Sequence, residues 1–102
     1  MEKIEIELHP EAQAEYLEAL QWYVDRSYRV GRRFQREFVR VVELIESDPD
    51  KGQVFEGPVR FIRLRRFPYV LYYQPIDSNR VQVLAVAHGR RRPGYWHHRR
   101  RE

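Results

Sequence analysis

The spacing of apolar residues changes once along this chain, and this change constrains the fold more than any other feature. Residues 10–47 carry apolar side chains at the three-to-four-residue interval of an amphipathic helix. Residues 59–88 carry aromatic and β-branched runs separated by short turns. A strictly alternating run, KIEIEL at residues 3–8, precedes both regions. The sequence therefore predicts a strand, then helices, then a set of strands.

Two helices are predicted within residues 10–47, because the helical pattern breaks at Ser27, a residue suited to cap a second helix. Asp48 and Pro49 stop that second helix, and residues 48–58 are expected to form a loop. The apolar stripe of the first helix is Ala12, Tyr16, Ala19, Leu20 and Tyr23, and that of the second is Val30, Phe34, Phe38, Val41, Val42 and Ile45. The two helices are expected to form a hairpin.

Three strands are predicted over residues 59–65, 69–74 and 80–88, joined by turns short enough for an antiparallel meander. Apolar residues occupy both faces of the last run, with Val81, Val83, Ala85 and Ala87 expected on one face and Leu84 and Val86 on the other. We therefore expect that run to be the central strand. Tyr69, Leu71 and Tyr73 are expected to share the core face of their strand.

The predicted fold class is α+β, in the order β-α-α-β-β-β. An antiparallel sheet of about four strands packs one face against the helical hairpin, since the sheet has no other cover available. With 102 residues, the chain is expected to form a single domain over residues 1–96. The remaining residues 97–102, HHRRRE, are expected to be a solvated, disordered basic tail.

Charge divides the chain into an acidic and a basic half. Residues 1–57 hold 8 Lys/Arg against 13 Asp/Glu, whereas residues 58–102 hold 11 against 2. A polyanion or an acidic protein is therefore expected to meet the second half. Seventeen of the 19 cationic residues are arginine, which suits phosphate and carboxylate ligands but also fits a genome rich in G and C.

The chain is expected to work in the cytoplasm and without a membrane partner. It has no cysteine, no signal-peptide pattern at its N-terminus and no apolar run long enough to span a bilayer. The four histidines lack the spacing of metal ligands, and no phosphate loop or nucleophile elbow is present. We therefore expect neither a metal nor a cofactor.

Two arginine clusters are the best candidates for function. Arg60, Arg63, Arg65 and Arg66 come from one strand and its turn, and Arg90, Arg91 and Arg92 follow the last strand. If that strand is central, the clusters are expected to converge on one rim of the sheet, near Tyr95 and Trp96. Such a set can hold phosphates and stack bases, or cleave RNA with help from His97, or simply be solvated.

The sequence resembles the RelE/ParE superfamily of toxins from bacterial type II toxin–antitoxin systems, and in particular its ParE-like, plasmid-stabilisation branch. The resemblance extends over nearly the whole chain. The matching residues are Ala12, Glu15, Ala19, Trp22, Tyr23, Phe34, Asp48-Pro49, Gly52, Arg63-Leu64, Phe67-Pro68-Tyr69, Tyr72-Tyr73, Ala87 to Arg91, Pro93, Tyr95 and Trp96. The superfamily's order of strand, two helices and three strands is the order read from the sequence pattern.

The resemblance implies two alternative activities. RelE-like members cleave mRNA on the ribosome, and their basic strand positions correspond here to Phe61, Arg63 and Val70, with a later arginine at Arg91. A proton-transfer group would then be Tyr95 or His97. Because positions 61 and 70 lack the cation, the resemblance favours ParE-like, non-enzymatic inhibition of DNA gyrase.

The resemblance also implies a cognate antitoxin that wraps the toxin and forms a hetero-oligomer with it. The residues expected to contact the target or the antitoxin are Trp22, Tyr23, Arg60, Arg63, Arg65, Arg90, Arg91, Arg92 and Trp96. A nucleic-acid-binding module without toxicity is a further alternative from a different functional class.

Overall fold

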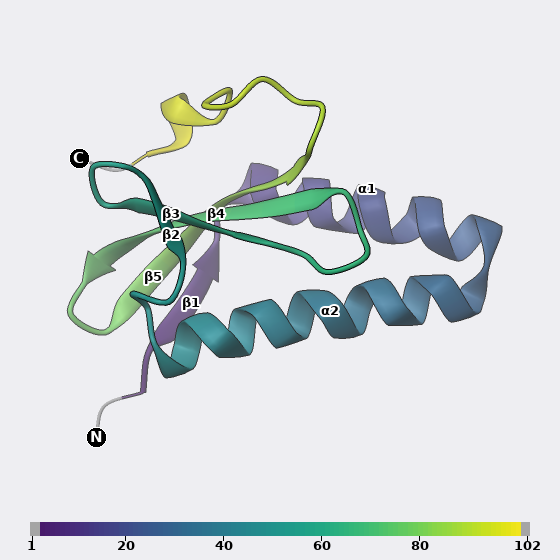
Figure 1. The fold of residues 1–102 in the computed structure, drawn as a ribbon, viewed down its shortest axis with the longest axis horizontal. Helices are drawn as coiled ribbons and strands as arrows, with labels where there is room; N and C mark the ends of the chain where they lie inside the picture. The colour runs from purple at the N-terminus through teal and green to yellow at the C-terminus, as the bar shows by residue number, and fades with distance from the viewer. Residues whose placement is uncertain (1–2, 101–102) are drawn as a thin grey trace.

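The predicted order of elements is confirmed by the computed structural model, which describes residues 3–100 (Figure 1). The elements are β1 (Glu5–Leu8), α1 (Pro10–Arg26), α2 (Tyr28–Ser47), β2 (Gln53–Glu56), β3 (Val59–Arg63), β4 (Tyr69–Asp77), β5 (Arg80–His88) and a short 3-10 helix, η1 (His97–Arg99). The α+β class and the helical hairpin on one face of a sheet are therefore as expected. No helix within residues 3–100 is long and apolar enough to cross a membrane.

The sheet differs from the prediction in strand number and direction. Five strands lie in the order β1-β5-β4-β3-β2, and β1 runs parallel to β5 while all other neighbours are antiparallel. The additional strand is β2, within the predicted loop 48–58, where only Val54 and Phe55 give an apolar signal. It pairs with β3 through a tight turn in which Gly57 has a φ of +51°. Strand β1 is parallel to β5, and the chain between them runs through both helices and then through strands β2, β3 and β4.

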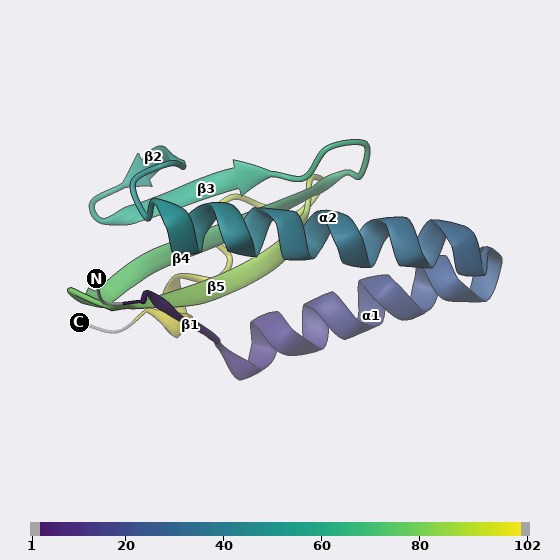
Figure 2. The same ribbon diagram turned by 90° about the horizontal axis from the view of Figure 1, so that it is seen from below.

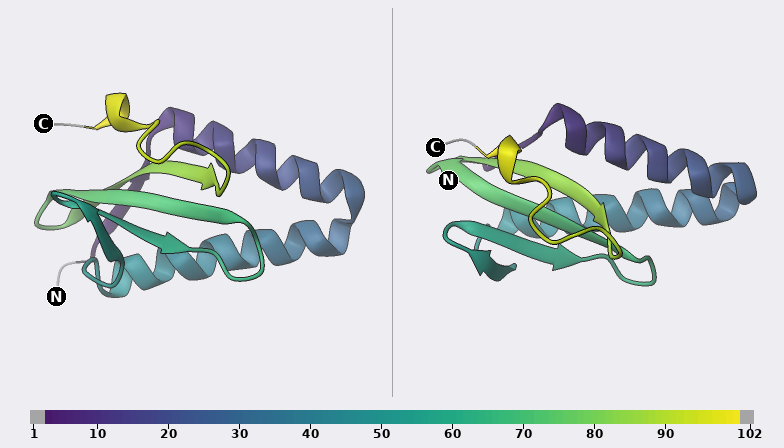
Figure 3. Two further views of the ribbon diagram at one scale, coloured as in Figure 1. Left: turned by 45° about the horizontal axis from the view of Figure 1, so that its top comes forward. Right: turned by 90° about the horizontal axis from the view of Figure 1, so that it is seen from above.

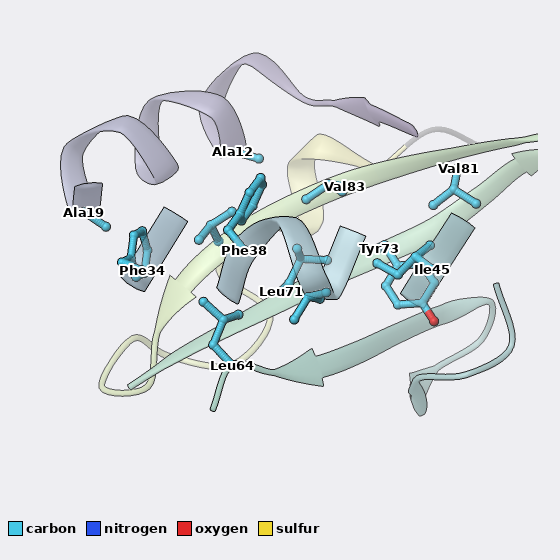
Figure 4. Close-up of a cluster of buried hydrophobic side chains, with 12 residues drawn as sticks. Ala12, Ala19, Phe34, Phe38, Ile45, Leu64, Leu71, Tyr73, Val81 and Val83 are labelled. Carbon is cyan, nitrogen blue, oxygen red and sulfur yellow. The ribbon is translucent and has the colours of Figure 1, made fainter. Parts of the chain in front are cut away.

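One face of the sheet, here called the helix face, packs against the hairpin (Figure 2). Phe34, Val41 and Ile45 of α2 and Ala12 and Ala19 of α1 are buried there, as the helical spacing predicted. They meet strand residues on the same face, including Leu71, Tyr73, Val81 and Val83 (Figure 4). The expectation that Tyr69, Leu71 and Tyr73 share the core face is confirmed.

The hairpin turns at a single residue. Ser27 is extended (φ −163°, ψ 116°), and its Oγ accepts a hydrogen bond from the Val30 N–H at 3.3 Å. The predicted cap is therefore present. Gly31 of α2 packs against Val24 of α1, where a Cβ would overlap the Val24 side chain. A one-residue turn and a glycine contact thus hold α1 and α2 side by side.

Strand β5 has apolar residues on both faces, but not in the predicted alternation. Tyr72 pairs with Ala85 and Tyr73 with Val83, so Leu84 is an extra residue in a β-bulge. The bulge puts Leu84, Ala85 and Ala87 on one side and Val86 with Val81 and Val83 on the helix face. The expected assignment of Ala85, Ala87 and Val86 to faces was therefore wrong, because a bulge resets the period-two pattern. The expectation that residues 80–88 form the central strand was also wrong: β5 lies inside the sheet, next to the central strand β4, because the parallel β1 adds one strand and β2 and β3 add two on the other side.

The opposite face of the sheet, here called the strap face, is covered by residues 89–100, which we call the C-terminal strap (Figure 3). Trp96 is 0 % exposed and packs on Phe55 and Tyr72, with ring centroids 5.4 and 4.9 Å away. Residues 97–99 form η1, and Arg99 is buried. The expectation of a solvated tail fails at Arg99, which is buried, whereas His97 and His98 are exposed as expected. Residues 101–102 lie outside the described residues.

Candidate functional site

The strap is joined to α1 through the carboxylate of Glu15. Glu15 Oε2 accepts a hydrogen bond from the Tyr95 hydroxyl at 2.6 Å, and Oε1 accepts one from the Val86 N–H at 3.0 Å. The register of β1 with β5 ends at Leu8 and Val83, so the outer edge of β5 continues beyond its neighbour. Glu15 therefore satisfies a backbone donor that would otherwise have no strand to pair with.

Arg99 completes this arrangement from the strap. Its Nη1 donates to the Leu84 carbonyl and to Glu15 Oε1, both at 3.0 Å, and its Nη2 donates to Glu15 Oε2 at 3.1 Å. Its Nε lies 3.5 Å from Glu11 Oε2, and the side chain is only 5 % exposed. The Glu15–Arg99 pair thus occupies the open edge of β5. The carboxylate accepts a hydrogen bond from the Val86 N–H, and the guanidinium donates one to the Leu84 carbonyl.

Tyr95 is held in its neutral form by this network. Burial and the hydrogen bond to Glu15 raise the pKa of its phenol far above its ordinary value of 10.0. The ring also lies beneath two cations, with the Arg91 and Arg99 guanidinium carbons 3.8 and 5.1 Å from its centroid. In this arrangement the Tyr95 hydroxyl donates a hydrogen bond to Glu15 and stays protonated near neutral pH.

A groove of about 400 Å³, here called the α1 groove, opens between α1 and the end of β5. Its lining residues are Glu15, Glu18, Ala19, Trp22, Tyr23, Pro68, Tyr69, Val86, His88 and Arg91. Trp22 is 51 % exposed, and the guanidinium carbon of Arg26 lies 3.5 Å from its ring centroid. The groove combines an exposed aromatic ring, a carboxylate at Glu18 and a cation at Arg91, which are the features of a surface that binds a protein segment.

Of the residues predicted from sequence, three contribute to the α1 groove: Trp22, Tyr23 and Arg91. Tyr23 does so from the core, since its ring packs against Phe34 and Phe67. Arg90 and Arg92, which flank Arg91 on the strap, are exposed. The groove is thus the place where the predicted residues of α1 and of the chain end meet.

The first arginine cluster does not join them there. Arg60 points to the helix-face side, where its Nη1 donates to the Gly52 carbonyl at 2.8 Å. Arg63 is exposed beside Phe61, 5.5 Å from that ring centroid. Arg65 lies in a different groove, between α2 and the turn after β3. The two clusters lie at the same end of the sheet, with β4 between the strands that carry them, and Arg91 and Arg65 line different grooves.

The strap residues predicted as functional have structural contacts in the described chain. Trp96 is fully buried in the strap face, and the His97 ring pairs with the Glu56 carboxylate of β2. His98 lies 3.2 Å from Glu11 Oε2 on α1. These contacts fasten the strap at both edges of the sheet, to β2 and to α1.

Sequence reasoning missed the partnership of Glu15 and Arg99. Glu15 was noticed only as one residue of a family pattern, and Arg99 was assigned to a solvated tail. The available signal was Glu15 itself, because its spacing from Ala12 and Ala19 puts it beside the buried stripe of α1. Nothing in the sequence pointed to its partner 84 residues later.

Two comparisons with known proteins identify what the chain is similar to. A family model described as the ParE toxin of the type II toxin–antitoxin system parDE matches residues 6–93. A solved structure described as the chromosomal ParDE TA system from P. aeruginosa is similar with a TM-score of 0.68 and 16 % sequence identity, over 83 % of this chain and 95 % of that one. At this identity the structural match speaks for a shared fold. No curated protein sequence matches.

Proposed function

Since the chain belongs to the ParE toxin family of type II toxin–antitoxin systems, we propose that it is a toxin that arrests growth by binding a macromolecular target. DNA gyrase is the preferred target, and a cognate antitoxin neutralises the toxin. Inhibition by binding is preferred to cleavage of mRNA on the ribosome.

The observation that carries this preference is the state of Tyr95. A ribonuclease needs a group that gives or takes a proton near neutral pH and cations that stabilise the charged transition state. The Tyr95 hydroxyl donates to Glu15 at 2.6 Å and its pKa is raised, so it is a poor acid under these conditions. The positions that carry cations in RelE-like enzymes are Phe61 and Val70 here. These residues support binding better than catalysis.

The α1 groove is the proposed contact for the antitoxin. Its Trp22 ring offers apolar area, Glu18 attracts a cation, and Arg91 attracts a carboxylate. Glu15 is already engaged by Tyr95, Val86 and Arg99, so it is not counted as a free acid. An antitoxin segment with an apolar side chain between opposite charges would complement this groove.

The target is tested with the purified toxin in two assays run in parallel. The expected result is loss of gyrase supercoiling activity, with no new cleavage sites when translated mRNA is mapped by toe-printing. Site-specific breaks in mRNA on stalled ribosomes, with supercoiling unaffected, would overturn the preference for gyrase.

The antitoxin contact is tested by two substitutions on the same helix. Trp22→Ala removes the exposed ring in the groove, whereas Leu17→Ala removes a side chain of equal exposure (52 %) that does not line it. We expect Trp22→Ala to raise the toxin–antitoxin dissociation constant by about 30-fold, the scale of a hot-spot residue. Leu17→Ala should change it by less than about threefold. Equal effects from both variants would argue against the groove.

A further inference from the structure

A second surface of the molecule concentrates positive charge away from the α1 groove. We call it the arginine surface; its members are Arg29, Arg32, Arg33, Arg36 and Arg40 of α2 and Arg65 and Arg66 of the turn after β3. Two adjacent hollows lie along it. One, of about 440 Å³, is lined by Tyr28, Arg29, Arg32, Arg33 and Arg36. The other, of about 580 Å³, is lined by Val30, Arg33, Arg36, Glu37, Arg40, Arg65, Arg66 and Phe67.

Helix α2 and the turn after β3 are brought together by one acid. The backbone N–H of Arg65 donates to Glu37 Oε2 at 2.6 Å, and this contact ties the turn to the helix (in Figure 2, α2 lies in front of the sheet). From residue 29 to residue 40 the helix rises about 16 Å. The arginine surface is therefore an extended strip and not a single anion site.

The charge on this strip is not neutralised by the protein. Glu37 is the only acid that lines either hollow, and its carboxylate already binds Arg40 Nε and Nη2 at 2.7 and 2.6 Å. Partial burial would raise the pKa of Glu37, but the hydrogen bonds from Arg40 and the Arg65 backbone outweigh it and lower the pKa. Within residues 3–100, no ion pair or hydrogen bond engages the side chains of Arg33, Arg36 or Arg66.

The backbone of the turn adds a second observation. Arg66 has a φ of +67°, the left-handed region that a residue with a side chain adopts at a cost of about 1 kcal/mol or more. It is the only residue other than glycine with a positive φ in the described chain. A fold that keeps an arginine in this conformation, beside the unpaired side chains of Arg33 and Arg36, holds repelling charges together.

Phosphate suits this strip better than carboxylate. Every member is arginine, whose planar fork binds phosphate oxygens in pairs. A nucleic acid brings one phosphate with every nucleotide, so any sequence supplies an extended row of anions, whereas a protein segment would need acids at closely repeated positions. At the end of the strip Tyr28 is 66 % exposed, and its hydroxyl accepts from Arg32 Nη1 at 3.2 Å. This ring offers a face on which a base can stack.

We propose that the arginine surface binds the sugar–phosphate backbone of a nucleic acid, independently of its sequence and separately from the α1 groove. The contact does not depend on which protein the toxin inhibits. A toxin that holds nucleic acid on one side and a protein on the other is concentrated on targets that themselves carry DNA or RNA.

The test measures binding of the full chain to a fluorescein-labelled 20-nucleotide single strand and to a 20-base-pair duplex by anisotropy, from 50 to 400 mM salt. The variant is Arg33→Gln with Arg36→Gln. The matched control is Arg90→Gln with Arg92→Gln, which removes the same number of exposed arginines from the strap. Circular dichroism and thermal melting verify that both variants are folded.

We expect the wild-type affinity to fall steeply with salt on at least one of the two probes. The Arg33/Arg36 variant should lower the slope of log K against log salt by about 1.4 on the single strand or about 1.8 on the duplex, and should weaken binding at 0.1 M salt by about 25-fold or more. The probe that responds identifies the form of nucleic acid. The control variant should lower the slope by less than half as much as the Arg33/Arg36 variant does.

Three outcomes would overturn the proposal. The first is equal loss of affinity in the two variants, which would indicate attraction to net charge alone. The second is no binding of either probe at 50 mM salt. The third is that poly-glutamate displaces the probe as well as unlabelled oligonucleotide does when both are added at the same concentration of negative charge. That result would assign the surface to acidic protein segments.

Discussion

The two faces of the sheet are both buried, but they are covered in different ways. The helix face is covered by α1 and α2, whose apolar stripes are periodic and continuous in sequence. The strap face is covered by twelve residues without periodicity, in which one indole ring provides the fully buried apolar contact and an ion-paired cluster provides the fastening. A repeated pattern spreads the stabilising free energy over many residues, whereas the strap concentrates it in Trp96, Arg99 and Gly94.

The largest test of this contrast replaces a buried ring on each face. Trp96→Ala and Phe34→Ala each remove a side chain that is 0 % exposed, and we expect each to lower the free energy of unfolding by about 3–5 kcal/mol. Urea denaturation of the two variants measures this. A loss below about 1 kcal/mol for Trp96→Ala alone would mean that the strap is an appendage that opens without disturbing the sheet.

The second test breaks the ion-paired cluster. Arg99→Met leaves Glu15 without its cation and the Leu84 carbonyl without its donor, so we expect a loss of about 2 kcal/mol. Glu15→Gln and the double variant complete a mutant cycle, in which the two losses should not add because the side chains are in contact. Additive losses would show that Glu15 and Arg99 stabilise the strap independently.

The third test concerns the backbone of the strap. Gly94 has a φ of +84°, and a Cβ there would overlap the His97 ring that pairs with Glu56. Gly94→Ala should therefore cost about 1–2 kcal/mol in unfolding free energy. Gly89→Ala is the control, because its added Cβ would lie at an ordinary contact distance of 3.5 Å from the Pro68 carbonyl. Equal melting temperatures for both variants would contradict the proposed strain.

The smallest effect is expected from alkaline pH. The pKa of the Tyr95 phenol is raised, so its neutral form is favoured in the folded state. Its contribution is complete below the ordinary value of 10.0 and is lost as the pH rises above it. Burial also raises the pKa of Tyr16, Tyr23, Tyr69, Tyr72 and Tyr73.

Stability measured between pH 9 and 11 should therefore fall for the wild type and fall less for Tyr95→Phe. The surface variant Tyr28→Phe is the control and should follow the wild type. If Tyr95→Phe and the wild type lose stability equally over this interval, Tyr95 does not contribute to the pH dependence.

Much of the fold could be predicted because its signals are local. Ser27 caps α2 through its own neighbours, and Phe34 to Ile45 form a stripe visible in twelve residues. Strand β2 was missed because Val54 and Phe55 are only two apolar residues in a turn-rich segment, and its pairing depends on the neighbouring β3. The bulge at Leu84 was missed because a two-to-one pairing leaves no mark in a run of small apolar residues.

The candidate site was predictable only in part. Trp22 and Arg91 were singled out from the sequence, and both line the α1 groove; their role in binding stays a prediction. Arg60, Arg63, Arg65 and Arg66 do not line the α1 groove, because β4 lies between β3 and the end of β5. The arginine surface was not anticipated, since Arg33 and Arg36 belong to neither of the two arginine clusters named from the sequence, and Arg66 was grouped with the strand residues Arg60 and Arg63.

The sequence by itself determined the class of the fold, the hairpin and the family. Periodicity and capping act over a few neighbouring residues, so they can be recognised in the sequence. Tertiary structure alone decided the role of the chain's basic end. Arg99 is a solvated residue in any local reading, and it becomes a buried partner only when Glu15, 84 positions earlier, meets it at the open edge of β5. The physical reason is that an unpaired strand edge and an unneutralised arginine strip are properties of neighbours in space, and these neighbours are far apart in the chain.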